Sequence, residues 1–184
     1  RWRRFSWDIL IVYRLLKIFF GQDRSVAIVH RRLERRFKND MPSYIAHRFG
    51  ITPDAPQSAF DRIAENYLPL GQKLFGSGFS YVQAVHDNDR SFTHINKCLF
   101  NDFFRQHGAP ELTSIFCALD SIWVDELSQS KYGVRFERPT TLAGGDDAVD
   151  LSFRGNKLGS GTSALAFYYC LSCRLAFIVE KCFK

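Results

Sequence analysis

The sequence contains no apolar stretch long enough to cross a bilayer as a helix. The best candidates are residues 7–20, which carry three charged side chains, and residues 164–179, which carry one arginine. Both fall short of the roughly 20 residues that a spanning helix needs. The Gly-Ser-Gly of residues 76–78 is too little for a phosphate cradle, which needs a longer Gly-rich turn with a Lys and a Ser or Thr. We find no internal repeat. These absences argue against a membrane-spanning helix, P-loop chemistry and a repeat architecture.

Cysteines are few and odd in number. Two of the five lie inside apolar helical patterns, which indicates reduced thiols in an intracellular protein rather than a disulfide framework. The Cys170-Leu-Ser-Cys173 spacing is one close pair without a second pair or neighbouring histidines, so a metal or thiol redox protein is the weakest hypothesis. We expect no metal and no cofactor. The five are Cys98, Cys117, Cys170, Cys173 and Cys182.

What the chain has in abundance is phenylalanine. There are 18 among 184 residues, and aromatic residues make up 15% of the sequence. This content argues against disorder and predicts a large apolar core, or an apolar pocket within one. The length suits one well-buried domain and is short for two.

The positive charge is concentrated at the N-terminus. Residues 1–40 hold 11 Lys/Arg against 4 Asp/Glu, whereas residues 41–184 hold 14 against 15. Such an asymmetry suggests an acidic partner, either a protein or an anionic membrane surface, and the alternative is a solvated helix face. Nucleic acid is disfavoured, because aromatic residues that would stack on bases are sparse between the arginines. Because the chain begins at Arg1 rather than Met, we expect that further sequence precedes it.

Hydrophobic spacing predicts an α+β domain. The order of elements gives a helical N-terminal half, then an antiparallel sheet covered by helices on one face. Pro69 and Gly71 are expected to break or kink the third helix. Helices are predicted at residues 2–20, 25–38, from Ser58 onwards, 97–106 and 111–127, and strands at residues 81–86, 91–95, 133–138 and 148–153.

Three parts are distinguished along the chain: a basic amphipathic helical arm at 1–40, an α+β core at 41–154 and an apolar extension at 155–184. The first helix is broadly apolar and carries several arginines. It could lie on a membrane surface, dock on the domain or bind a partner subunit. We expect a cytoplasmic protein, with peripheral attachment to a membrane as the alternative.

Two cysteines are candidates for chemistry. Cys98 opens the helix at 97–106, where the positive end of the helix is expected to lower the thiol pKa. Cys117 and Asp120 share one face of the next helix, and the short turn between the two helices favours antiparallel packing. The competing interpretation is that each cysteine is a small core residue.

Motifs in residues 96–153 resemble a known family. In chain order they are Cys98, Gly108-Ala109-Pro110-Glu111-Leu112, Cys117 with Asp120, Phe136 with Arg138, Thr141-Leu142-Ala143-Gly144-Gly145, and Asp150 with Phe153. This series is similar to the L-2-amino-thiazoline-4-carboxylic acid hydrolase family of bacterial proteins. Two positions depart from the family pattern: its third cysteine is Val149 here, and the Phe after its Asp is Leu151.

The resemblance implies hydrolytic opening of a thiazoline carboxylate at its amidine-like carbon, giving an N-carbamoyl cysteine, by an enzyme acting on C–N bonds. In that reading Cys98 is the nucleophile with Cys117 beside it, and Asp120 and Asp150 face the amidinium or act as base and acid. The implied substrate-binding residues are Arg138, Thr141, Gly144 and Gly145.

Simpler alternatives stand beside each role. Asp120 and Arg138 could pair with each other, and the two glycines could only make a turn. The whole chain could also be a non-catalytic relative, a subunit or peripheral protein of a larger and membrane-bound complex. That alternative predicts that removing residues 1–21 abolishes association while the core stays folded. The enzyme reading predicts a pocket lined by Cys98, Cys117, Asp120 and Asp150.

Overall fold

Helices make up the first half of the chain, as expected. The computed structural model describes residues 2–52, 54–55, 58–127 and 132–155. In chain order its elements are α1 (Trp2–Phe20), α2 (Gln22–Phe49), α3 (Ala59–Phe75), β1 (Phe79–His86), β2 (Arg90–Cys98), α4 (Leu99–Gln106), α5 (Thr113–Leu119), α6 (Ser121–Leu127), β3 (Val134–Glu137) and β4 (Val149–Gly155).

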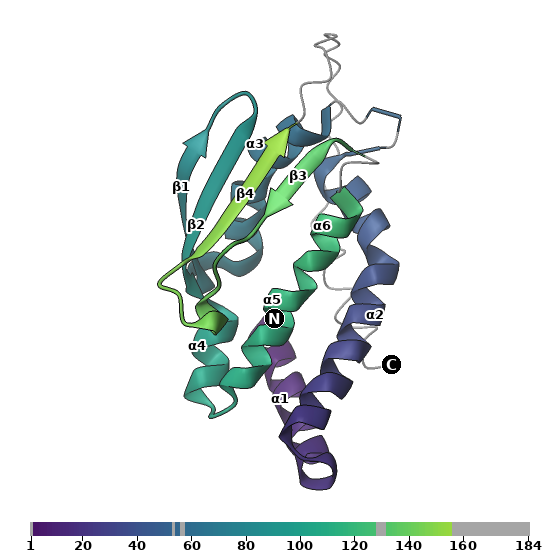
Figure 1. Cartoon of the computed structure of the whole chain (residues 1–184), viewed down its shortest axis with the longest axis vertical. Helices are drawn as coiled ribbons and strands as arrows, with labels where there is room; N and C mark the ends of the chain where they lie inside the picture. The colour runs from purple at the N-terminus through teal and green to yellow at the C-terminus, as the bar shows by residue number, and fades with distance from the viewer. Residues whose placement is uncertain (1, 53, 56–57, 128–131, 156–184) are drawn as a thin grey trace.

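The strands form one antiparallel sheet in the order β1-β2-β4-β3 (Figure 1). Its side chains alternate, as a pleated sheet requires. Ile95, Val149 and Leu151 are buried on the inner face, whereas the paired His94 and Asp150 lie on the outer face. The α+β class, with a helical N-terminal half and an antiparallel sheet, is therefore confirmed.

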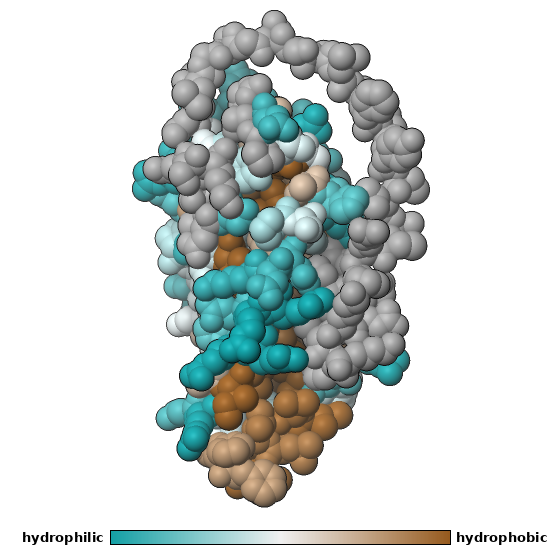
Figure 2. All heavy atoms as spheres, turned by 90° about the vertical axis from the view of Figure 1, so that its right-hand side faces the viewer, coloured by the Kyte–Doolittle hydropathy of each residue, from teal (hydrophilic) through white to brown (hydrophobic). Residues whose placement is uncertain are grey.

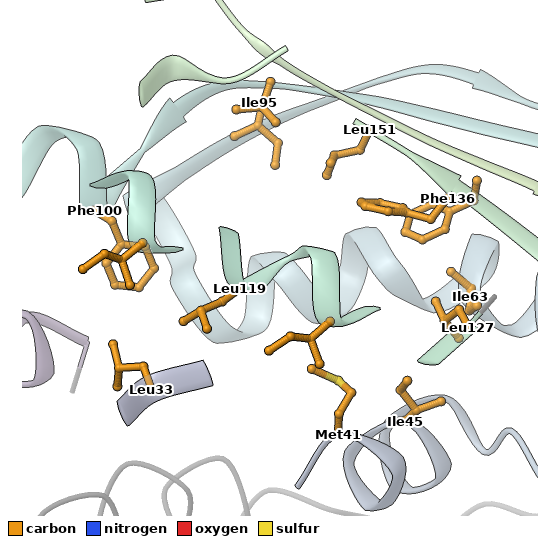
Figure 3. Packing of buried hydrophobic residues seen from close by; sticks show 14 of the residues in the cluster. Leu33, Met41, Ile45, Ile63, Ile95, Phe100, Leu119, Leu127, Phe136 and Leu151 are labelled. Carbon is orange, nitrogen blue, oxygen red and sulfur yellow. The ribbon is translucent and has the colours of Figure 1, made fainter. Parts of the chain in front are cut away.

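The helices cover the inner face of the sheet. Side chains from the strands face residues of α5 and α6, and α2 packs from the other side of these helices (Figure 3). The same hydrophobic cluster includes Phe5, Ile9 and Tyr13 of α1. Of the three arrangements open to the first helix, the structure has it docked on the domain.

Both proline-containing helices are longer than their sequence predicts. α2 continues through Pro42 to Phe49, because Met41, Ile45 and Phe49 keep the four-residue spacing and are buried. It ends at Gly50, whose φ of 62° is left-handed and suits glycine. α3 likewise continues through Pro69 and Gly71 to Phe75. In both helices, burial of an apolar face outweighs the cost of proline.

Two other boundaries differ. The helix expected at residues 111–127 is divided into α5 and α6 at Asp120. Cys98 is the last residue of β2 and precedes α4, rather than lying in the first turn of the helix. Both corrections concern residues of the candidate site.

One motif residue has a structural role. The Tyr13 hydroxyl donates a hydrogen bond to the Glu111 carboxylate, and Lys17 lies 3.6 Å from the same carboxylate. These contacts attach α1 to the turn between α4 and α5. Glu111 therefore anchors the N-terminal helix.

Candidate active site

A cavity of about 220 Å³ lies between the inner face of the sheet and the helices. Its walls are mainly apolar and aromatic. Figure 3 shows three of the lining residues: Ile95 and Leu151 on the sheet and Phe100 at the start of α4. Three of the four predicted catalytic residues line it: Cys98, Cys117 and Asp120. Arg138, the predicted carboxylate clamp, lines it as well.

Each of these side chains comes from the end of an element. Cys98 ends β2, Cys117 lies in the last turn of α5, Asp120 follows α5, and Arg138 comes directly after β3. A hydrogen bond joins the α5–α6 junction to the end of β3: Arg138 Nη1 donates to Asp120 Oδ2 at 2.7 Å. The simple alternative, that these two residues pair with each other, is what the structure shows.

That ion pair leaves bonding capacity unused. It engages one carboxylate oxygen and one guanidinium nitrogen, and a guanidinium carries five N–H groups. Within the part of the chain that the structure describes, no second hydrogen bond occupies Asp120 Oδ1 or the remaining nitrogens of Arg138. Both side chains can therefore keep their contact while a ligand binds beside it.

Asp120 is an unusual carboxyl group. Part of its side-chain surface remains accessible, but this surface faces a cavity whose apolar walls solvate a charge poorly. Burial therefore raises the pKa of Asp120 to about 6, and Arg138 acts against a larger rise. A carboxyl group with this pKa can exchange protons near neutral pH.

The two thiols are not activated, contrary to the expectation for Cys98. Burial raises the pKa of Cys98 to about 11, outweighing the backbone N–H groups of Phe100 and Asn101 at the start of α4. Burial also raises the pKa of Cys117. The predicted lowering of the Cys98 pKa was wrong. Burial disfavours the charged thiolate by more than the N–H groups at the start of a short helix favour it.

Two tyrosines complete the polar part of the cavity, and sequence reasoning missed both. Tyr67 of α3 and Tyr81 of β1 line it. Burial raises the pKa of each hydroxyl, and the charge of Asp120 raises it further, so both remain neutral donors. Nothing in their spacing connects them to the cysteine motifs. Only the packing of α3 against β1 places them beside Asp120.

A glycine allows Tyr81 its position. A Cβ atom on Gly71 of α3 would lie 2.7 Å from the Tyr81 hydroxyl oxygen and 2.8 Å from its Cζ. Real Cβ atoms do not approach so closely, so the ring rests on the helix only because residue 71 has no side chain.

We expect Gly71→Ala to destabilise the protein by about 1 kcal/mol, although alanine is the better helix former, since Tyr81 must move into the cavity. Urea denaturation measures this change. Gln72→Ala, at the exposed neighbouring position, is the control and should change stability by less than about 0.5 kcal/mol. Stabilisation by both substitutions would contradict the close contact.

The fourth predicted catalytic residue lies elsewhere. Asp150 is on the outer face of the sheet, where its carboxylate is 2.5 Å from Nδ1 of His94. Its backbone N–H donates to Thr140 Oγ1 at 2.9 Å. Asp150 is not among the residues that line the cavity, because the pleat that turns Val149 and Leu151 inward turns Asp150 outward. Val149 lines the cavity at the position of the missing family cysteine.

The predicted substrate-binding turn is also outside the cavity. The Gly144 N–H donates to Thr141 Oγ1 at 3.0 Å, and the Thr141 N–H donates to Asp146 at 2.7 Å. Gly145 has a φ of 97°. The Ala143 N–H of this turn contacts Cys117 and acts to lower the pKa of its thiol, against the larger effect of burial. The glycines shape a turn beside α5.

Within residues 2–52, 54–55, 58–127 and 132–155, no three His, Cys, Asp or Glu side chains gather as they would around an ion. The cysteines at 170, 173 and 182 lie outside the described residues.

A family model described as L-2-amino-thiazoline-4-carboxylic acid hydrolase matches residues 9–153. The match confirms the resemblance drawn from residues 96–153 and extends it to α1. No curated protein matches the sequence.

Among solved structures, the chain is similar to a trafficking protein particle complex subunit 3 from Naegleria fowleri covalently bound to palmitic acid. The two are 17% identical with a TM-score of 0.44, and the match covers 84% of this chain and 96% of the other. At that identity and score the likeness carries no inference about function.

Proposed function

Because the chain belongs to the L-2-amino-thiazoline-4-carboxylic acid hydrolase family, we propose that it hydrolyses a cyclic amidine carboxylate in the cavity beside Asp120 and Arg138. One observation supports this proposal above the others. Three motif residues that are far apart in the sequence line a single cavity: Cys98, Asp120 and Arg138. That cavity contains a carboxyl group poised to exchange protons near neutral pH.

In the proposed reaction Asp120 is the general base. Its second oxygen accepts a proton from a water molecule as that water attacks the amidine-like carbon of the ring. The bond between this carbon and the ring sulfur then breaks, and Asp120 returns the proton to the departing sulfur. One water is consumed. Because N-carbamoyl cysteine keeps both C–N bonds, the bond that breaks is C–S rather than the C–N bond implied by the resemblance.

Arg138 holds the substrate carboxylate. Its guanidinium retains N–H groups beyond the one given to Asp120, and a planar fork suits a carboxylate. Tyr67 and Tyr81 contribute neutral hydroxyl donors beside the reacting carbon. Cys98 stays a protonated thiol at neutral pH, so water is the nucleophile in this proposal.

The test is turnover of 2-amino-thiazoline-4-carboxylate by the full chain, followed through the new thiol and N-carbamoyl cysteine. Cys98→Ser should retain activity within about tenfold, since it removes no charge and no proton carrier. Loss of all activity in that variant, together with a trapped adduct on Cys98 of the unmodified protein, would replace water by the thiol as nucleophile. Absence of product under all conditions would refute the proposed reaction.

A second candidate function is association with an anionic membrane surface, the non-catalytic alternative. The observation that favours it is a cap of exposed apolar side chains at the α1–α2 turn, visible as the brown end of the molecule in Figure 2. Exposed basic residues adjoin this cap on both helices. The cap comprises Ile11, Leu15, Ile18, Phe19 and Phe20.

An anionic lipid surface is the occupant that this combination fits, because apolar side chains enter the interface while arginines bind lipid phosphates. The attachment would be peripheral. Among the described helices, none combines the length and the apolar character that a membrane crossing requires.

We expect Ile18→Ser with Phe19→Ser to weaken binding to phosphatidylserine-containing vesicles by about tenfold or more. These side chains are 75% and 77% exposed, so the fold should be preserved. Val82→Ser, an exposed apolar residue on the outer sheet face, is the control for co-sedimentation. Equal binding by both variants would remove this candidate. Deleting residues 1–21 is unsuitable as a test, because it removes buried core residues of α1.

A further inference from the structure

The cavity is far more apolar than a small thiazoline needs. Asp120 and Arg138 form a charged pair in it, and the polar side chains grouped with them are the two thiols and the hydroxyls of Tyr67 and Tyr81. A ring with one amidine and one carboxylate would be satisfied by this polar part alone. Elsewhere in the lining the polar groups are Asp40, which pairs with Arg36 at 3.1 Å, the hydroxyls of Tyr44 and Thr113, and the indole N–H groups of Trp2 and Trp123. The other side chains of the walls are hydrocarbon and offer such a ligand no hydrogen bond.

A continuous series of aromatic rings leads away from the polar part. The Tyr81 ring stacks on Phe79 with centroids 5.8 Å apart. Phe79 contacts Phe75 at 4.4 Å, and Phe75 contacts Trp2 at 4.9 Å. All four residues line the same cavity. The space therefore extends from Asp120 and Arg138 along an aromatic wall made by β1, α3 and α1.

Beyond the Tyr81 hydroxyl, that wall has no free hydrogen-bond donor among Phe79, Phe75 and Trp2. The Trp2 indole N–H already donates to the Leu74 carbonyl at 2.9 Å, and the phenylalanine rings have none. A polar group placed against the wall would lose its hydration without gaining a partner, which is costly. An apolar group placed there gains affinity from its own burial. The wall therefore selects for hydrocarbon.

We infer that the substrate is an amphiphilic carboxylate, with its acid on Arg138, its cyclic amidine beside Asp120 and an alkyl or arylalkyl body along the aromatic wall. This inference rests on the proposed function and names its substrate class. Specificity then comes from the aromatic wall, and the bare thiazoline carboxylate is a minimal version of the substrate.

Calorimetric titration of the full chain with ω-phenylalkanoates, from phenylacetate upwards, tests the inference without turnover. Affinity should rise about fourfold per added methylene over the first several members. Dicarboxylates of matched length should show no such rise. Arg138→Met should weaken binding of each acid by about tenfold and leave the corresponding amides unchanged.

A substitution inside the cavity and a control on the outer face of the sheet test whether the wall sets the chain-length dependence. Leu74→Trp, which narrows the cavity, should end the rise at a shorter chain, whereas Val82→Trp on the outer face should not change it. If Leu74→Trp fails to fold, the phenylalkanoate series measured on the unmodified protein still tests the inference. A flat series there, or dicarboxylates that bind as well as phenylalkanoates, would overturn the inference.

A turnover measurement distinguishes this inference from the proposed hydrolysis. A 5-benzyl derivative of 2-amino-thiazoline-4-carboxylate should be hydrolysed with at least tenfold higher kcat/KM than the unsubstituted compound. Hydrolysis of the unsubstituted compound with a flat binding series would overturn the substrate class and keep the hydrolase. A rising series without hydrolysis of either compound would overturn the hydrolase and leave a binding site for amphiphilic acids.

Discussion

Asp120→Asn is expected to lower kcat for thiazoline hydrolysis by about 10²- to 10⁴-fold, the range associated with loss of a positioned general base. Asparagine keeps the size of the side chain and its contact with Arg138, but it cannot accept the proton of the attacking water. The measurement is steady-state turnover of the variant at saturating substrate.

The pH dependence of turnover by the unmodified protein tests the same role of Asp120. A general base must be deprotonated, and the pKa of Asp120 is raised to about 6. Activity should therefore fall about tenfold per pH unit below pH 6 and level off above it. Asp120→Asn should remove this acid limb from its residual activity.

Two other carboxyl groups provide the controls. Asp102 is exposed on α4, so Asp102→Asn should leave kcat within about twofold. Asp150→Asn should change kcat by less than about tenfold, because this carboxylate faces His94 on the outer side of the sheet. A large loss in Asp150→Asn with none in Asp120→Asn would reverse the assignment of the base.

Substituting either partner of the Asp120–Arg138 ion pair should lower the free energy of unfolding, and the loss should be larger for Asp120 than for Arg138. Asp120→Asn keeps a hydrogen bond to Arg138 but removes the charge that offsets the guanidinium, which cannot lose its own charge in an apolar cavity. It should destabilise the fold by about 2 kcal/mol, less than the roughly 3–5 kcal/mol of a fully buried pair, because part of the Asp120 side chain is accessible. Arg138→Met should cost less, because an unpaired Asp120 can take up a proton. Denaturant titration of both single variants and the double variant measures the coupling, expected at about 1–3 kcal/mol.

The pH dependence follows from the raised pKa. Between the ordinary aspartate pKa of 3.8 and the raised pKa of about 6, the folded protein holds a proton on Asp120 that the unfolded chain has released. The contribution of this group to stability is therefore full below pH 3.8 and is lost as the pH rises to about 6. Arg138 normally opposes that rise in pKa. In Arg138→Met the pKa should be higher still, and stability should continue to fall at a higher pH. Equal losses in the two single variants, independent of pH, would show that the cavity solvates both charges well.

Local patterns were sufficient for the types of element. The four-residue spacing along α1 and the alternation along β4 each report which face is buried, and burial is what stabilises both elements. Boundaries were less accurate where two local signals compete. Pro42 and Pro69 signal helix ends, but the buried faces of α2 and α3 continue past them, and that energy is set by residues distant in sequence.

The candidate site shows the same division. The motifs identified Cys98, Cys117, Asp120 and Arg138, and the structure places them on one cavity. The motif that contains Asp150 did not indicate which face of the sheet this side chain occupies. A one-residue change in strand register moves a side chain from the inner face to the outer face.

What the sequence by itself determined is the α+β class, the family and the residues that carry the charges and thiols. Only the tertiary structure decided their chemical state. Burial raises the pKa of Cys98 where a helix start alone would lower it, and it brings Asp120 to about 6. Tyr67 and Tyr81 join the site because α3 packs on β1 at Gly71. Desolvation and long-range contacts depend on atoms brought together by folding, and no local pattern contains them.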